Sequence, residues 1–216
     1  MIKVENIDTW GFEHAIRGMR NPLNSWSRSD SYAGEPDCFE NCGNCTLGEF
    51  FVGENDLKLM HQLYVGGQPH RKYLRQIFAV MDITAPLYWW KEFDTYKVGT
   101  TANSCSTMHK IAAKEFTLSD FSTEHLVGKS VAALQNVLDV MNLEREHYLA
   151  AKDKDCWWQM IQLLPSSYNQ RRTVSMTYEN VMNMLDYREG HKLDEWREFC
   201  KILKQLPYVE EIRDGK

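Results

Sequence analysis

Residues 76–94 read QIFAVMDITAPLYWWKEFD, and this stretch joins two clear structural signals. Its first nine residues alternate in polarity and end in β-branched side chains, which is typical of a buried strand. Pro86 suits the first turn of a helix, and Leu87, Trp90 and Phe93 would then fall on successive turns. We therefore expect a buried strand over 76–84 that leads into an aromatic helix.

Helical patterns extend from this stretch in both directions. Residues 55–65 predict a helix that Asn55 caps and Gly66 ends. The later elements are a long helix over 129–151, a helix over 153–164, a strand over 171–178, and helices over about 178–188 and 191–206. Helices outnumber strands in a mixed order, so the predicted class is α+β, a helix-rich domain with several long helices around a small antiparallel or mixed sheet.

Composition excludes some classes of partner. The 216 residues carry a formal net charge of −5, with 43% hydrophobic and 25% charged residues. This balance argues against a nucleic-acid binder that relies on bulk positive charge. No apolar run reaches the roughly 18–20 residues of a membrane span, and the N-terminus lacks the pattern of a signal peptide. We expect a cytoplasmic protein without membrane or nucleic-acid partners.

Residues 20–49 predict a long irregular segment with two notable motifs. RNPLNSWSRSDS, at 20–31, is rich in donors suited to an anion or a nucleotide, although a solvated surface loop has the same composition. CFENCGNC places Cys38, Cys42 and Cys45 at spacings that suit zinc thiolates, but a fourth ligand would have to come from elsewhere. A loop with free thiols fits equally, so no metal is assigned.

Polar residues concentrate in 89–110, WWKEFDTYKVGTTANSCSTMHK. Residue types alone leave three interpretations open. Cys105 and His109 would share a helical face and could form a nucleophile and base. KVGTTANS could bind phosphate, although it lacks the P-loop pattern. In the third interpretation the segment is a polar loop in which Ser104 or Ser106 caps a helix.

Residues 56–207 resemble the flavin-dependent thymidylate synthases (ThyX), especially their phage and prophage relatives. That family's signature reads Arg-His-Arg, two residues, Ser, one residue, Asn, two residues, Ser, one residue, Arg-Tyr. With its last Ser placed on Ser106, Asn103 falls on the Asn and Thr101 replaces the first Ser. The Leu-Leu-Pro at 163–165 resembles a further family motif. Arg188 falls on an arginine that the family uses at its nucleotide site.

The charged positions of the signature depart from the family. Tyr96, Lys97 and Val98 replace Arg-His-Arg, and Met108 and His109 replace Arg-Tyr. Glu179 stands where the family has a flavin-binding Arg, and Ile161 where an Arg precedes Leu-Pro. Lysine cannot reproduce the two parallel bonds of an arginine fork to a phosphate. We therefore expect flavin binding that is weaker than in the family or absent.

The resemblance implies reductive one-carbon transfer to C5 of a pyrimidine deoxynucleotide such as dUMP, with FAD, NADPH and methylenetetrahydrofolate. It also implies a homotetramer, and a ThyX-like domain over 51–216 behind an N-terminal extension over 1–50. The residues assigned by this resemblance are Ser106, Lys97 and His109 for catalysis, Thr101, Asn103, Ser106, Arg188 and Arg172 for the substrate, and Lys97 and Arg171 for the cofactor.

Two other functions remain open from the sequence. A non-catalytic protein on the same scaffold could sequester or sense a nucleotide for a phage, and the missing basic residues favour this alternative. A purely structural oligomer is the third, and the dense polar residues of 91–109 argue against it. The arginines that could replace the missing charges are Arg171, Arg172, Arg17, Arg20 and Arg28.

Overall fold

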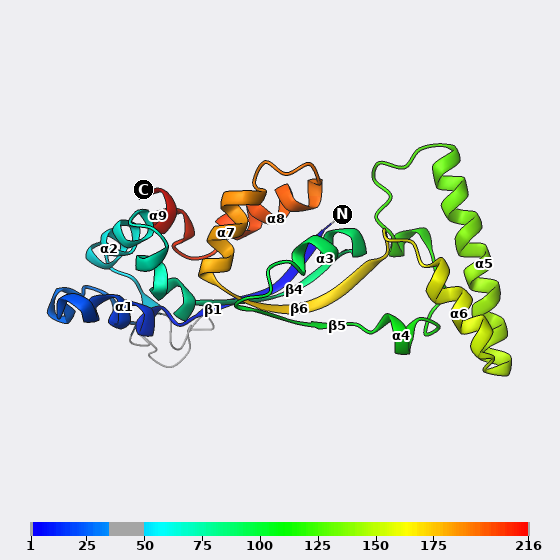
Figure 1. Cartoon of the computed structure of the whole chain (residues 1–216), viewed down its shortest axis with the longest axis horizontal. Coiled ribbons are helices and arrows are strands. Elements are labelled where there is room, and N and C mark those ends of the chain that lie inside the picture. Colours follow the sequence, from blue (N-terminus) through cyan, green and yellow to red (C-terminus); the bar gives the residue numbers. More distant parts are fainter. Residues whose placement is uncertain (1, 35–49, 216) are drawn as a thin grey trace, which may run out of the picture. The chain divides into compact units, whose positions relative to one another are not determined.

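The computed structural model of the chain describes residues 2–34 and 50–215, and 56% of the structure is helical (Figure 1). The α-helices are α1 (Phe12–Arg20), α2 (Glu54–Val65), α3 (Leu87–Phe93), α4 (Thr107–Lys110), α5 (Lys129–Ala151), α6 (Lys154–Leu163), α7 (Tyr178–Arg188), α8 (Asp194–Lys204) and α9 (Val209–Asp214). The strands are β1 (Lys3–Trp10), β2 (Tyr32–Ala33), β3 (Phe50–Phe51), β4 (Phe78–Pro86), β5 (Thr100–Ser104) and β6 (Asn169–Thr177). Short 3-10 helices are η1 (Asn21–Leu23), η2 (Trp26–Arg28), η3 (Gln68–Gln76) and η4 (Leu118–Asp120). The predicted helix-rich α+β class is confirmed.

The main sheet is small and antiparallel, with the strand order β1-β4-β6-β5. Every second side chain of β4 is buried, namely Ala79, Met81, Ile83 and Ala85. This alternation is the signal that predicted the strand, which begins and ends two residues later than expected. Strands β2 and β3 form a separate antiparallel pair in which Tyr32 lies opposite Phe51.

The chain divides into two compact units. Unit 1 consists of 1–6, 81–174 and 191–199, and unit 2 consists of 7–80, 175–190 and 200–216. Each unit has its own buried core, as described below. The expected division into an N-terminal extension over 1–50 and a ThyX-like domain over 51–216 stays a prediction.

Aromatic side chains form the first core of unit 1. Trp89, Trp90 and Phe93 of α3 are almost fully buried, as are Trp196 and Phe199 of α8. The ring centroids of Trp89 and Trp196 are 4.8 Å apart, within the range of favourable aromatic contacts. The predicted aromatic helix is therefore present, although Pro86 is its N-cap residue and also the last residue of β4.

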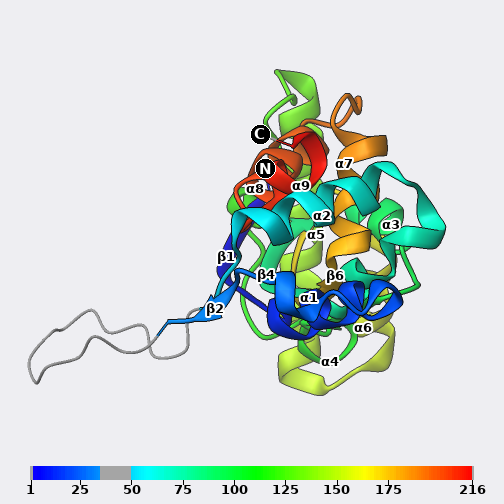
Figure 2. The ribbon, with the colours of Figure 1, turned by 90° about the vertical axis from the view of Figure 1, so that its left-hand side faces the viewer.

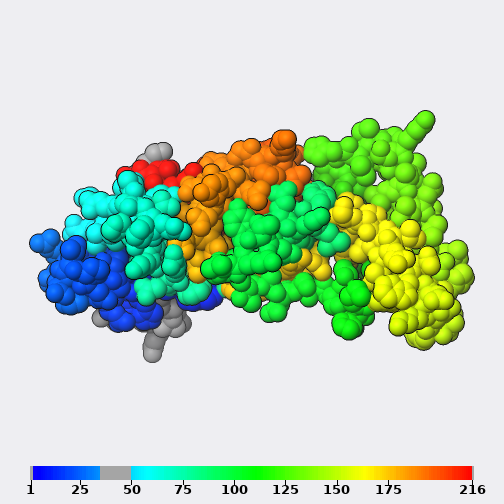
Figure 3. Space-filling model, viewed as in Figure 1, coloured from blue at the N-terminus to red at the C-terminus, as the bar shows by residue number. Residues whose placement is uncertain are grey.

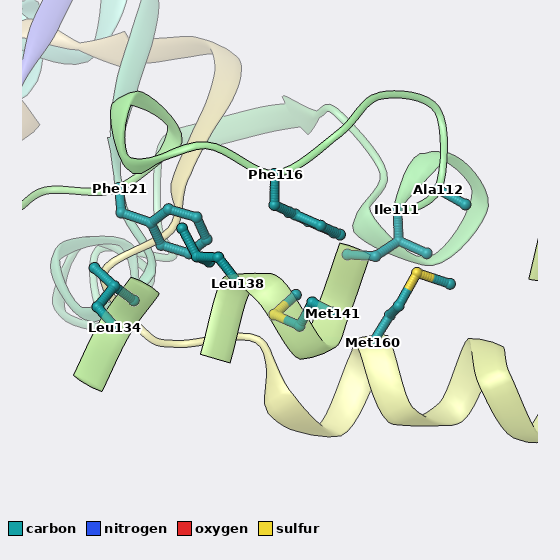
Figure 4. Close-up of a cluster of buried hydrophobic side chains, with 8 residues drawn as sticks. All are labelled: Ile111, Ala112, Phe116, Phe121, Leu134, Leu138, Met141 and Met160. Carbon is teal, nitrogen blue, oxygen red and sulfur yellow. The ribbon is translucent and has the colours of Figure 1, made fainter. Parts of the chain in front are cut away.

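A second core of unit 1 lies under helices α5 and α6, which pack against each other (Figure 1). Figure 4 shows Leu138, Met141 and Met160 pointing toward the same cluster of apolar side chains. The cluster consists of Ile111, Ala112, Phe116, Phe121, Leu134, Leu138, Met141 and Met160. The spacing of three and four residues that predicted the long helix is thus the spacing of its buried face.

Unit 2 is built around α1, α2, α7 and α9. Helices α2 and α9 lie next to each other, as Figure 2 shows from the end of this unit. The rings of Phe12 and Tyr178 meet edge to face at 5.4 Å, and Tyr178 is fully buried. Helix α1 was not predicted, although Phe12, Ala15, Ile16 and Met19 have the helical spacing of a buried face.

The start of α2 differs from the prediction. The N-cap residue is Gly53 and not Asn55, and glycine has no side chain that could accept a capping hydrogen bond. Instead the Asp30 carboxylate accepts hydrogen bonds from the backbone N–H groups of Asn55 and Asp56, at 2.9 and 3.2 Å. A residue distant in sequence therefore satisfies the helix terminus, which a local cap pattern cannot reveal.

The donor-rich segment 20–31 binds an anion of its own chain. Asp56 is fully buried and accepts hydrogen bonds from Arg20 Nε at 2.6 Å, Ser29 Oγ at 2.6 Å and Ser31 Oγ at 2.7 Å. Burial raises the pKa of Asp56, but these hydrogen bonds and the Arg20 charge outweigh it and lower the pKa. The segment is thus ordered by an internal carboxylate.

Candidate functional site

Residues 97–109 form the exposed edge of unit 1. Strand β5 is the outer strand of the sheet beside β6, and Thr101 and Asn103 on it are exposed. Helix α4 follows directly, and it lies at the surface in the space-filling view (Figure 3). The polar residues that the sequence singled out are therefore accessible to a ligand rather than buried in a core.

Ser106 is the N-cap of the short helix α4. Its Oγ accepts a hydrogen bond from the backbone N–H of His109 at 3.1 Å, so the interpretation in which Ser104 or Ser106 caps a helix is confirmed for Ser106. The hydroxyl proton of Ser106 remains a donor that this cap bond does not use. His109 lies in the single turn of α4 and is exposed.

The proposed pairing of Cys105 with His109 on one helical face is wrong. Cys105 precedes the cap residue, so it does not belong to α4. Its backbone N–H donates to the carbonyl of Arg171 at 2.9 Å, and its carbonyl accepts from Gln170 Nε2 at 2.8 Å. These bonds tether the segment to β6.

Arg171 and Arg172 are neighbours on β6 with different acidic partners. Successive side chains of a strand point to opposite faces, and the contacts agree with this. Arg171 Nη2 lies 2.7 Å from Asp82 Oδ2, whereas Arg172 Nη1 lies 2.8 Å from Asp94 Oδ1. The guanidinium of Arg172 also covers the Trp90 ring at 4.2 Å. The two arginines predicted for the site, Arg171 and Arg172, therefore lie on different faces of the sheet.

Asp82 gathers several donors from the sheet. It accepts hydrogen bonds from Thr173 Oγ1, Asn6 Nδ2 and Arg171 Nη2. These bonds, with that of Thr173 the largest, lower the pKa of Asp82 well below its usual range. Arg171 is thus already neutralised by a carboxylate, which reduces the charge that it can offer a phosphate.

Lys97 and Arg188 belong to different compact units. Lys97 is exposed in the turn between α3 and β5, where Gly99 adopts a φ of 79°. It makes no ion pair with another residue in the described part of the chain. Arg188 is the last residue of α7, is half-buried and belongs to unit 2. Its part in a nucleotide site therefore stays a prediction.

Two departures from the family signature have local structural explanations. Glu179 forms a two-bond ion pair with Arg75 in unit 2, with Nε–Oε2 at 2.6 Å and Nη2–Oε1 at 3.0 Å. Ile161 packs against the second core of unit 1. Of these two positions, where the resemblance places cations, Glu179 is thus held in an ion pair and Ile161 is a partly buried apolar side chain.

Unit 2 also carries a polar cleft of about 950 Å³. Its lining includes Arg28, Ser27 and Asn24 from the 20–31 segment and Lys58 from α2. The sequence had indicated Arg28 among the possible replacement cations. The cysteines 38, 42 and 45 lie outside the described residues. No helix among the residues described is long and apolar enough to cross a membrane.

Comparison with known proteins gives a likeness of fold. No family model matches the chain, and no curated protein matches it in sequence. The structure has the helix-rich fold of thymidylate synthase X (ThyX) from Helicobacter pylori, solved with FAD and dUMP, at a TM-score of 0.68 and 16% identity, over 98% of this chain and 96% of that chain. A second structure of the Helicobacter pylori flavin-dependent thymidylate synthase with FAD and dUMP gives a TM-score of 0.66 and 15% identity, over 96% of both chains.

Proposed function

We propose that this chain is a ThyX-like enzyme that binds a pyrimidine deoxynucleotide such as dUMP at residues 97–109. The observation that carries the proposal is the placement of Thr101, Asn103 and Ser106 on the exposed β5–α4 edge. The fold shared with structures that hold dUMP supports it. The reaction would be a reductive one-carbon transfer to C5 of the base.

Each site residue has a chemical task in this proposal. The amide of Asn103 can donate and accept, which suits the edge of a pyrimidine base, and the hydroxyls of Thr101 and Ser106 supply further hydrogen bonds. Lys97 offers a positive charge to the phosphate or to charge that develops on the base. His109 would stack on the substrate or bond to it. Two further substrate contacts are proposed: Arg188 from the resemblance, and Arg172 as a replacement for a missing basic residue.

Among the described residues of one chain, several positions that the resemblance expects to be cationic carry no free positive charge, which does not suit tight FAD binding. Glu179 and Ile161 replace expected cations, and Arg171 is paired with Asp82. We therefore assign weak flavin binding, with Lys97 and Arg171 as its contacts. FAD reduced by NADPH would supply the hydride, and methylenetetrahydrofolate would supply the one-carbon unit. A homotetramer that shares its sites between copies would bring further residues to the flavin.

Calorimetric titration with dUMP tests the nucleotide site. Thr101→Val and Ser106→Ala should each weaken binding by about 1 kcal/mol, the usual value of a neutral hydrogen bond. Ser130→Ala is the matched control, because Ser130 is an exposed hydroxyl on α5 in the same unit. Equal dUMP affinity in all three variants and the parent would show that the polar edge is only scaffold.

Turnover separates the enzyme from a binding protein. The parent should convert dUMP to dTMP when FAD, NADPH and methylenetetrahydrofolate are all added. Nucleotide binding without any turnover under these conditions would favour the sequestering or sensing protein. In that case the paired Glu179 and the partly buried Ile161 would mark the loss of flavin chemistry.

A further inference from the structure

Helices α5 and α6 bring three metal-ligating side chains together outside the proposed nucleotide site. Glu144 and His147 are one turn apart on α5, and Cys156 lies in the first turn of α6. A carboxylate oxygen, an imidazole nitrogen and the thiol sulfur of these residues all lie within 4.8 Å of one another. Figure 1 shows the two helices running side by side.

The convergence follows from the packing of the hairpin. Met141 and Met160 are fully buried between the helices and the rest of the second core (Figure 4). Glu144 follows Met141 by three residues, and Cys156 precedes Met160 by four, so each lies on the same helix face as its methionine. The two ligands therefore lie on the facing sides of the helices, one turn beyond a fixed core contact.

A tight connection fixes this end of the hairpin. Lys152 adopts a left-handed conformation with a φ of 56°, and its N–H donates to the Tyr148 carbonyl at 2.8 Å. Asp153 then caps α6 by accepting a hydrogen bond from the N–H of Asp155. The chain thus leaves one helix and starts the next with little freedom to separate them, which pre-orients Cys156 toward Glu144.

We propose that Glu144, His147 and Cys156 bind one zinc ion that clamps α5 to α6. Thiolate and imidazole are ligands that zinc prefers, whereas magnesium and calcium take oxygen ligands. Zinc bonds of about 2.0–2.3 Å in a tetrahedron place ligand atoms about 3.3–3.7 Å apart. Movements of the three ligand atoms by roughly 1 Å, through side-chain rotation, would therefore close the site around the ion. The fourth position is open to water.

The charge around the thiol suits a dication. Glu144 is a hydrogen-bond partner of the Cys156 thiol, and the carboxylates of Asp153 and Asp155 add negative charge around it. A zinc ion would be attracted by this negative field and would bind Cys156 as the thiolate.

Cobalt titration of the full chain provides the test. The cysteines at 38, 42 and 45 are first replaced by serine, so that their thiols cannot contribute. We expect one equivalent of Co²⁺ to bind with a thiolate-to-cobalt charge-transfer band and tetrahedral visible bands, and one equivalent of Zn²⁺ to bleach them. Zinc should also raise the melting temperature of this protein.

Variants assign the signal to the three ligands. Cys156→Ser should abolish the charge-transfer band and weaken binding by more than roughly 100-fold, because even outer-shell losses cost 10–100-fold. His147→Gln and Glu144→Gln should each weaken binding at least tenfold. Cys105→Ser, which removes an exposed thiol elsewhere in unit 1, is the matched control and should leave the cobalt bands and the cobalt affinity unchanged.

Several results would overturn the zinc site. The first is that the chain with serine at 38, 42 and 45 gives no cobalt signal. The others are a cobalt signal that survives Cys156→Ser and a cobalt signal that Cys105→Ser removes. The unmodified chain gives an independent test that needs no triple substitution. There, the double variant Glu144→Gln, His147→Gln should bind one cobalt ion fewer than the parent, and an unchanged stoichiometry would also refute the proposal.

Discussion

Replacing Glu179 by Gln should strengthen flavin binding. In the parent, the Glu179 carboxylate occupies the fork of Arg75 through bonds of 2.6 and 3.0 Å. The substitution removes one negative charge where the family resemblance places a flavin contact, and it leaves the Arg75 fork available to a phosphate. The Arg75 side chain is 51% exposed, so solvent screens the gain. We expect about 1 kcal/mol, or about fivefold in the Kd for FAD.

The stability of the variant should change little. An exposed ion pair contributes about 0–1 kcal/mol, so the free energy of unfolding should fall by no more than this. Flavin binding can be followed by the quenching of FAD fluorescence at increasing protein concentration. Glu179→Asp keeps the charge, and Glu146→Gln makes the same charge change on α5, so both should leave the Kd near that of the parent. A Kd for Glu179→Gln equal to or weaker than that of the parent refutes the assignment.

The remaining predictions concern stability, nucleotide binding and assembly. Asp56→Asn should lower the free energy of unfolding in urea by about 3–5 kcal/mol, because it leaves the buried Arg20 charge without its counter-ion, whereas Glu54→Gln on the exposed side of α2 should change it by less than about 0.5 kcal/mol. Because the folded pKa of Asp56 is lowered, its contribution is present above its ordinary pKa of 3.8 and is lost as pH falls further, so the parent should be more acid-sensitive than Asp56→Asn. Arg188→Ala should abolish dUMP binding in calorimetry while the melting temperature stays within a few degrees, and a variant that simply unfolds would assign Arg188 to the scaffold. Light scattering should give a mass of four chains of 25.3 kDa, and the mass of one chain at micromolar concentration would exclude shared sites.

The sequence was most informative where burial imposes a period. Helix α5 begins and ends at the predicted residues, because Leu134, Leu138 and Met141 repeat at helical spacing. Strand β4 was found through its alternation. Strands β1 and β5 were missed because they contain no buried residue, and a strand without a buried face carries no hydrophobic period.

Partners distant in sequence were beyond prediction. Glu179 and Arg75 are separated by 104 residues, and neither belongs to a motif that announces the other. Asp30 caps α2 from a segment that carried only a loop pattern. The Glu144–His147 pair did have a local signal, since its spacing places both side chains on one helix face, but its third member follows only after a turn. Local patterns therefore predicted elements better than they predicted the contacts that give a site its charge.

The burial of the tryptophans has a spectroscopic consequence. Trp89, Trp90 and Trp196 lie fully buried in unit 1, whereas Trp10 and Trp26 of unit 2 are 46% and 49% exposed in the folded chain. An indole that leaves an apolar core for water shifts its emission to longer wavelength, and one that is already half in water shifts much less. Intrinsic fluorescence should therefore report the melting of unit 1, while far-ultraviolet circular dichroism follows the helices of both units. Any separation between the two melting curves then measures directly how independently the units unfold.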